Sequence, residues 1–149
     1  MSAQWKLYID GASRNNPGPS GAGVYLTKND VPVIKQGFFL GIKTNNEAEY
    51  LALLLGLFFA RQHMVPGDTL IVISDSQLLI RQLQGLYKIT KPHLRALYDC
   101  AQTIMQAHHY TCEHVLREYN SIADKLANDG IDSKTRVPAD FLSLCSVYT

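Results

Sequence analysis

The stretch WKLYIDGASRNNPGPSGAGVYLTKNDVPVIKQGFFL, residues 5–40, decides the fold. Residues 5–9 alternate apolar and polar side chains, and residues 23–27 and 31–40 are rich in β-branched and aromatic residues, so all three segments are predicted to be β-strands. The turn-forming residues 15–21 predict a loop between the first two strands, and a short Lys-Asn-Asp turn joins the last two. The beginning of the chain is therefore predicted to be an antiparallel meander.

The rest of the chain alternates predicted helices and strands. From Asn45 or Asn46, apolar side chains recur at helical spacing until a Pro-Gly pair, and residues 69–73 form a continuous apolar run typical of a buried strand. The remaining predicted elements are a helix that follows Asp75-Ser76 and stops at Gly85, a helix over residues 94–105, a strand over 110–116 and a last helix that Asn120 or Ser121 caps and that ends near Gly130. This order predicts an α/β protein whose mixed five-stranded sheet carries helices on both faces. We expect one domain over residues 1–130 and a C-terminal tail over residues 131–149.

The composition is that of a folded globular domain without a strong overall charge. Apolar residues make up 46% of the 149 residues and charged residues 18%, which excludes an intrinsically disordered chain. The formal net charge is +1, so no overall positive field would attract nucleic acid, and any binding of a nucleic acid must be local.

The sequence also bears on the compartment. The three cysteines Cys100, Cys112 and Cys145 are an odd number without CxxC spacing, which argues against a disulfide framework and for a reducing environment. The start of the chain lacks the pattern of a signal peptide, and the longest apolar run is too short to span a bilayer. We expect a cytoplasmic protein, a monomer, that does not associate with membranes.

Four acidic residues occupy positions at which catalysis competes with a purely structural role. Asp10 ends the first predicted strand and Asp75 ends the fourth, and strand ends are where α/β folds place their sites. Glu49 lies on a small, apolar helix face that offers no Lys or Arg to pair with it. The structural alternatives are an Asx-turn for Asp10, a helix N-cap for Asp75, a solvent-facing position for Glu49 and a capping box, Ser121-x-x-Asp124, for Asp124.

Taken together, the four carboxylates point to a metal site. Asp10 and Asp75 can lie on neighbouring strands, with Glu49 and Asp124 on the first turns of helices above them. Such a cluster repels itself unless divalent cations neutralise it, and ligand sets made only of oxygen favour Mg²⁺ or Mn²⁺ over zinc. Two ions about 4 Å apart form the clamp used in phosphoryl displacement.

These carboxylates lie in segments that resemble the type 1 ribonuclease H family in their order and spacing. The similarity runs from about Tyr8 to Ala127, and four segments carry it: YIDGASRNNPGPSGAG, TNNEAEYLALLLGL, ISDSQLLIRQLQG and REYNSIADKLA. The resemblance implies the ribonuclease H-like fold and an endonuclease that cuts the RNA strand of an RNA/DNA hybrid. It implies two Mg²⁺ ions, which Mn²⁺ could replace, held by Asp10, Glu49, Asp75 and Asp124.

The resemblance also assigns residues that contact the substrate. Asn16, Asn46 and Gln77 match amide side chains that follow the hybrid in this family, and amides suit minor-groove base edges and RNA 2′-hydroxyls. Thr44 matches a position that holds a phosphate of the DNA strand. The implied reaction is hydrolysis, in which one metal activates water and the other stabilises the leaving 3′ oxygen, so the products carry 5′-phosphate and 3′-hydroxyl ends.

Two departures from the family pattern are visible. Residues 116–121 contain none of the histidines found before the last aspartate in many bacterial members, and Arg117 stands in that short loop. A long basic protrusion is also missing, so the chain is more similar to a compact, archaeal-like subgroup. We expect Lys88 and Lys91 to hold the hybrid weakly, with Lys134 and Arg136 as a second possible patch.

Three alternatives remain at this point. His108, His109, Cys112 and His114 could suggest zinc, although their spacing matches no standard zinc motif. The same fold could also serve as a nuclease-dead binding domain, but all four carboxylates are intact. A related nuclease that acts on DNA is the third alternative, and the NNPGPSG and DSQ segments favour the hybrid-cutting branch.

Overall fold

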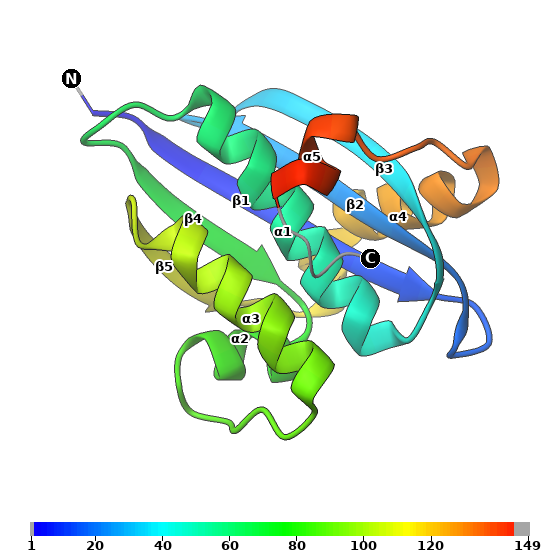
Figure 1. Ribbon diagram of the computed structural model, residues 1–149. Coiled ribbons are helices and arrows are strands. Elements are labelled where there is room, and N and C mark those ends of the chain that lie inside the picture. Colours follow the sequence, from blue (N-terminus) through cyan, green and yellow to red (C-terminus); the bar gives the residue numbers. More distant parts are fainter. Residues whose placement is uncertain (1, 145–149) are drawn as a thin grey trace.

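The computed structural model describes residues 2–144 and contains one five-stranded sheet with the strand order β3-β2-β1-β4-β5 (Figure 1). The β1–β2 and β2–β3 pairs are antiparallel, whereas β4 runs parallel to both β1 and β5. The predicted mixed sheet and its opening meander are therefore confirmed. The strands are β1 (Gln4–Ser13), β2 (Gly18–Lys28), β3 (Val31–Lys43), β4 (Thr69–Ser74) and β5 (His109–His114).

Helices cover both faces of this sheet, as predicted. α1 and α3 lie on one face and α4 lies across the meander on the other (Figure 1). The short α5 packs on α1, where the rings of Phe58 and Phe141 meet edge to face at 5.8 Å. The helices are α1 (Asn45–His63), α2 (Gln77–Leu83), α3 (Pro92–Met105), the 3₁₀ turn η1 (Arg117–Asn120), α4 (Ser121–Ser133) and α5 (Ala139–Leu144).

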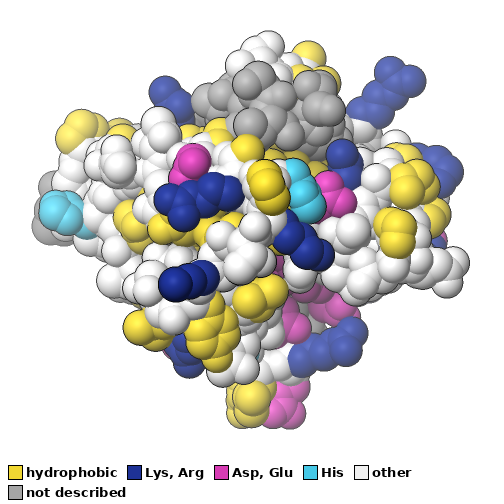
Figure 2. Space-filling view, turned by 60° about the horizontal axis from the view of Figure 1, so that its bottom comes forward, with side chains coloured by type: hydrophobic (Ala, Val, Ile, Leu, Met, Phe, Trp, Pro, Cys, Tyr) yellow, Lys and Arg dark blue, Asp and Glu magenta, His cyan; other side chains and the backbone are white. Residues whose placement is uncertain are grey.

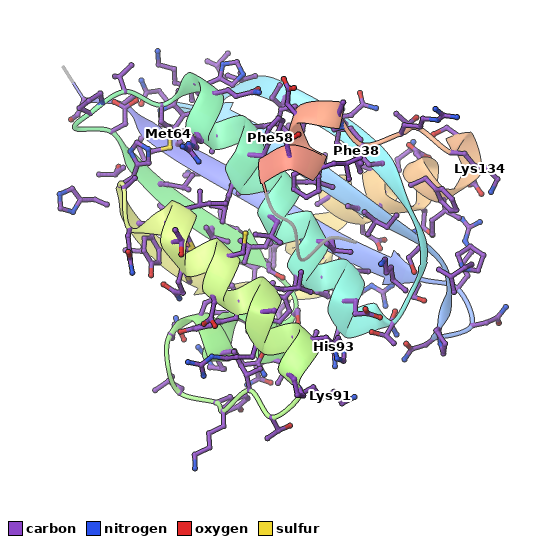
Figure 3. The ribbon with its side chains drawn as sticks, in the orientation of Figure 1. Phe38, Phe58, Met64, Lys91, His93 and Lys134 are labelled. Atoms are coloured by element: carbon purple, nitrogen blue, oxygen red, sulfur yellow. The ribbon has the colours of Figure 1, made fainter. Side chains whose placement is uncertain are left out.

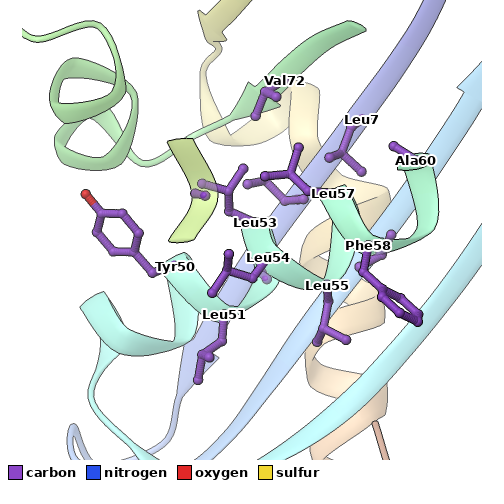
Figure 4. Close-up of a cluster of buried hydrophobic side chains, with 14 of the residues drawn as sticks. Leu7, Tyr50, Leu51, Leu53, Leu54, Leu55, Leu57, Phe58, Ala60 and Val72 are labelled. Carbon is purple, nitrogen blue, oxygen red and sulfur yellow. The ribbon is translucent and has the colours of Figure 1, made fainter. Parts of the chain in front are cut away.

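The central helix α1 begins at a capping box. The Thr44 hydroxyl accepts a hydrogen bond from the Glu47 N–H at 3.2 Å, and the Glu47 carboxylate accepts one from the Thr44 N–H at 3.0 Å. Beyond this first turn the helix is apolar on nearly every side, because it is enclosed by the sheet, α3 and α5. In Figure 4 its leucines lie beside Leu7 of β1 and Val72 of β4, at the centre of the core.

Glycines of β2 and β3 allow α4 to lie directly on the other face. A Cβ atom on Gly21 would come within 2.1 Å of the Ala127 carbonyl oxygen, and one on Gly23 within 2.0 Å of the Ala123 oxygen. The loop predicted over residues 15–21 was therefore too long: β2 already begins at Gly18. Those glycines resemble turn residues in the sequence, but Gly21 serves close packing between strand and helix.

Other boundaries moved by a few residues. The β2–β3 turn is confirmed, with Asn29 and Asp30 both at positive φ, as a two-residue hairpin requires. β1 runs on to Ser13, so Asp10 does not end the strand as predicted. α4 extends to Ser133 and Phe141 is fully buried, while the division into residues 1–130 and 131–149 stays a prediction.

The cysteines differ from expectation. Cys100, on α3, is disulfide-bonded, so the prediction of reduced cysteines was wrong for this residue. Cys112 is free, and burial raises the pKa of its thiol to about 11. Cys145 lies outside the described residues. Within residues 2–144, no helix is long and apolar enough to cross a membrane.

Candidate active site

The four predicted carboxylates meet in one open cavity of about 450 Å³. Asp10 comes from β1, Glu49 from the first turns of α1, Asp75 from the residue after β4 and Asp124 from the first turn of α4. The parallel pairing of β1 with β4 brings Asp10 and Asp75 to the same end of the sheet. The cavity thus lies where one helix from each face approaches the central strands.

Asp10 and Glu49 are brought together by a close approach of β1 and α1. Gly11 has no side chain, and a Cβ atom there would lie 2.2 Å from the Ala48 carbonyl carbon. The Gly11 N–H donates a hydrogen bond of 2.5 Å to Glu49 Oε1, so this carboxylate is fixed beside Asp10. The sequence predicted that Glu49 finds no Lys or Arg on its own helix face. In the structure its hydrogen-bond partner is a backbone N–H of β1.

Asp75 and Asp124 are not engaged in the capping that the sequence allowed. The N-cap of α2 is Ser76, whose hydroxyl accepts from the Leu79 N–H at 3.2 Å. The N-cap of α4 is Asn120, which makes no side-chain capping bond, so the suggested capping box at Ser121 is absent. Both carboxylates consequently face the cavity instead of closing a helix end.

The cluster is electrostatically strained without a cation. Burial, together with the neighbouring charges of Glu49 and Asp75, raises the pKa of Asp10 to about 10. Burial likewise raises the pKa of Glu49 to about 7, although the Gly11 N–H opposes the shift. One of the four carboxylates has a cationic partner: Arg117 Nη2 lies 3.9 Å from Asp124 Oδ1, and the Arg117 side chain is 81% exposed. Such a site favours a divalent cation over a mobile surface arginine.

The donor set fits a hard divalent metal, but the side chains are not yet arranged around one. Within residues 2–144 no group of three or more His, Cys, Asp and Glu side chains is positioned to hold a metal ion. The same finding covers the zinc alternative, because the described residues His108, His109, Cys112 and His114 form no such group.

The residues expected to contact the substrate are placed at different distances from the cavity. Asn46 lines the cavity directly, together with Asn45. Asn16 is exposed, and its Oδ1 accepts a hydrogen bond from the Asn45 N–H at 2.9 Å, which ties the β1–β2 loop to the start of α1. The Thr44 hydroxyl takes part in the capping box, and Gln77 is exposed at the start of α2, outside the cavity lining. Their role in binding stays a prediction.

The basic side chains are dispersed. Lys88 and Lys91 are exposed in the segment between α2 and α3, and Figure 3 shows Lys91 and His93 at the start of α3, far from Lys134 at the end of α4. Lys134 Nζ lies over the Phe39 ring, 4.5 Å from its centroid. On the face shown in Figure 2, Lys and Arg side chains stand apart from one another and form no continuous stripe.

Sequence reasoning missed Arg14, which lines this cavity, and the contact that Asn120 makes with Asp75. Arg14 lines the cavity from the β1–β2 loop, where Asp132 of α4 holds its guanidinium at 2.7 Å. Asn120 was interpreted as a helix cap, yet its amide reaches Ile9 and Asp75. Arg14 lies four residues after Asp10, which was a signal within the local sequence. The contacts of Asn120 span 111 and 45 residues and leave no such signal.

Comparison with known proteins places this site in a family. Residues 8–130 match the family described as reverse transcriptase-like. The chain is 36% identical over 136 residues to the bifunctional protein Rv2228c of Mycobacterium tuberculosis, covering 89% of this chain and 37% of that protein. It is 37% identical over 127 residues to ribonuclease HI of Halobacterium salinarum, covering 84% of this chain and 63% of that one. The chain thus spans less than two thirds of the length of these relatives.

Solved structures agree with this placement. The crystal structure of RNase H1 from Halobacterium salinarum superimposes with a TM-score of 0.82 at 36% identity, covering 87% of this chain and 98% of that one. LC11-RNase H1 in complex with an RNA/DNA hybrid gives 0.83 at 33% identity, covering 87% and 97%. The fold, with four acidic residues converging in one cavity, is of the ribonuclease H type. The chain belongs to the ribonuclease H family, whose members generally use divalent metal ions.

Proposed function

We propose that this protein hydrolyses the RNA strand of an RNA/DNA hybrid. The observation that carries the proposal is the convergence of Asp10, Glu49, Asp75 and Asp124 in one solvent-open cavity. An open cavity suits a polymeric substrate that lies across the site, and a similar protein, LC11-RNase H1, has been solved in complex with such a hybrid. Hydrolysis adds water across the P–O3′ bond and leaves 5′-phosphate and 3′-hydroxyl ends.

The four carboxylates would hold two Mg²⁺ ions, for which Mn²⁺ can substitute. The bound metal supplies a more acidic water and neutralises charge on the phosphate oxygens. The protein's own contribution is to hold the carboxylates together despite their repulsion, through the Gly11 N–H on Glu49 and the Asn120 amide on Asp75. Arg14 and Arg117, which line the cavity, would offer cations to phosphates of the substrate.

The deciding experiment offers the purified protein, with Mg²⁺, an RNA/DNA hybrid, duplex RNA, duplex DNA and the single strands. We expect cleavage of the hybrid only, and a loss of about tenfold or more when 2′-deoxynucleotides replace the RNA around the cleaved bond, since the 2′-hydroxyl distinguishes RNA from DNA. Equal cutting of duplex DNA would favour a DNA-acting nuclease. Binding of the hybrid without cleavage of any substrate would favour a nuclease-dead domain.

A second prediction concerns how the hybrid is held. Lys88 and Lys91 are exposed in the segment between α2 and α3, and each phosphate that a lysine neutralises steepens the fall of affinity with salt. We expect weak binding with a shallow salt dependence. In the double variant Lys88→Ala/Lys91→Ala, the slope of log affinity against log salt should fall by about 1 for each phosphate that the protein no longer neutralises. Fluorescence anisotropy at several salt concentrations measures this slope.

The matched control is Lys134→Ala/Arg136→Ala, which removes the same charge from the distant end of α4. It should leave both the affinity and the slope close to those of the unmodified protein. One outcome would contradict this prediction: the affinity-against-salt curve of Lys88→Ala/Lys91→Ala superimposes on that of the unmodified protein, while the curve of the control variant shifts. The hybrid would then be held at the end of α4.

A further inference from the structure

The side chain of Asn120 links three of the elements that carry the carboxylates. Asn120 lies at the junction of η1 and α4, four residues before Asp124, and is 2% exposed. Its Nδ2 donates to the backbone oxygen of Ile9 at 2.9 Å and to Asp75 Oδ1 at 3.1 Å. Ile9 immediately precedes Asp10, so a single amide joins the strand of Asp10, the end of the strand of Asp75 and the helix of Asp124.

This arrangement is not what the end of a helix requires. Asn120 makes no side-chain capping bond to α4, and its Oδ1 is buried without a hydrogen-bond donor among residues 2–144. Buried amides usually have both ends satisfied, so this side chain is poorly placed for stability alone. Its hydrogen bonds all point toward the acidic cluster.

The chemistry of an amide suits this position. A lysine or arginine would neutralise Asp75 and compete with a bound cation, whereas an amide N–H holds one carboxylate oxygen without adding charge. With Asp75 Oδ1 held by the Asn120 amide, the Asp75 carboxylate is restricted in rotation. Its second oxygen is left for another ligand. Groups that orient a metal-binding side chain in this way commonly matter nearly as much as the ligands themselves.

We propose that Asn120 is a positioning residue that fixes the Asp75 carboxylate against the end of β1 and so sets the geometry in which the acidic cluster binds divalent metal. The proposal rests on the proposed function for its catalytic consequence, but metal binding by the free protein tests it separately. A residue that served only to hold the chain together would alter stability and leave metal affinity unchanged.

The test compares Asn120→Ala and Asn120→Asp with the unmodified protein. Calorimetric titration of the free protein with Mg²⁺ and with Mn²⁺ measures metal affinity, and hybrid cleavage is followed as a function of Mg²⁺ and of hybrid concentration. For Asn120→Ala we expect metal affinity or turnover to fall by about 10- to 100-fold, while the KM for the hybrid changes less than about twofold. Asn120→Asp keeps the shape of the side chain but turns a carboxylate oxygen toward Asp75, so it should lose at least as much turnover.

The control is Asp68→Ala, at the opposite end of β1. Asp68 is also buried, at 3% exposure, and it accepts hydrogen bonds from the Ala3 N–H, the Trp5 indole N–H and the Val65 N–H. This variant should lose thermal stability while its Mg²⁺ titration and turnover, measured where it is folded, remain those of the unmodified protein.

The outcomes separate the possible failures. If the unmodified protein binds metal but cuts no hybrid, the proposed function fails, and the titrations still test Asn120. Both Asn120 variants are studied at a temperature where circular dichroism shows them folded. If they keep the metal affinity and turnover of the unmodified protein, the positioning role is overturned. If Asn120→Ala does not fold at any temperature, unmodified metal affinity and turnover in the shape-preserving Asn120→Asp would overturn it equally.

Discussion

Asp75→Asn should abolish cleavage of the hybrid, and Asp10→Asn should do the same. Both carboxylates lie in the shared cavity, and an amide there lacks the negative charge with which a carboxylate binds a divalent cation. We expect kcat to fall by at least about 10³-fold, which corresponds to about 4 kcal/mol of lost transition-state stabilisation. Gel assays of hybrid cleavage over a range of Mg²⁺ concentrations measure the loss.

Asp129→Asn on the same helix as Asp124 is the matched control. Asp129 pairs with Lys125 at 2.8 Å on the exposed side of α4 and does not line the cavity. This variant should cleave at the unmodified rate. Mg²⁺-dependent cutting retained by Asp75→Asn or Asp10→Asn would contradict the assignment of the acidic cluster as the catalytic centre.

The same substitutions should leave the metal-free protein as stable as before or more stable, with a defined pH dependence. The pKa of Asp10 is raised to about 10 and that of Glu49 to about 7, whereas in the unfolded chain both lie near 4. Between these limits the folded protein binds more protons than the unfolded chain, so the free energy of unfolding falls as the pH rises. In EDTA, melting temperatures should therefore decline from pH 5 to pH 8, and Asp10→Asn should reduce that decline.

The fold could be predicted from the sequence because its elements have strong local patterns. The alternation in β1, the helical spacing in α1 and the Asn29-Asp30 turn each determine an element without reference to distant residues. The start of β2 could not be located, because residues 18–21 resemble a loop until Gly21 is known to pack against α4. Distant packing, which leaves no local pattern, decided that boundary.

The site could be predicted in part for the same reason. The carboxylates were identified by their places near strand ends and in first helical turns, and the cavity brings all four together. Local reasoning nevertheless placed Asp10 at the end of β1, although the strand continues through Gly11 to Ser13. It also could not tell whether the Asn120 side chain caps α4 or contacts Asp75. The residue stands at the N-terminal end of α4 in either case, and the sequence does not show where its side chain points.

Gly11→Ala should impair both stability and catalysis, because the backbone of α1 packs directly against β1 at Gly11. The added Cβ would lie 2.2 Å from the Ala48 carbonyl carbon and 2.4 Å from the Glu49 nitrogen, and both of these are backbone atoms that no side-chain rotation can move away. Relief requires α1 to shift away from the sheet, at a cost of about 1–3 kcal/mol of stability. Chemical denaturation with urea measures that cost.

The catalytic effect of Gly11→Ala follows from the same shift. Glu49 Oε1 accepts its hydrogen bond from the Gly11 N–H, so displacing α1 separates Glu49 from Asp10 and opens the acidic cluster. A displacement of about 1 Å at a catalytic group costs about 10²-fold in rate, and we expect kcat to fall by at least this factor in the folded protein. Gly67→Ala is the control: its Cβ would meet nothing within 4 Å, but the φ of +94° is strained for alanine. That variant should lose about 1–2 kcal/mol and keep its kcat, whereas a Gly11→Ala protein with unmodified kcat would show that the contact between β1 and α1 does not set the position of Glu49.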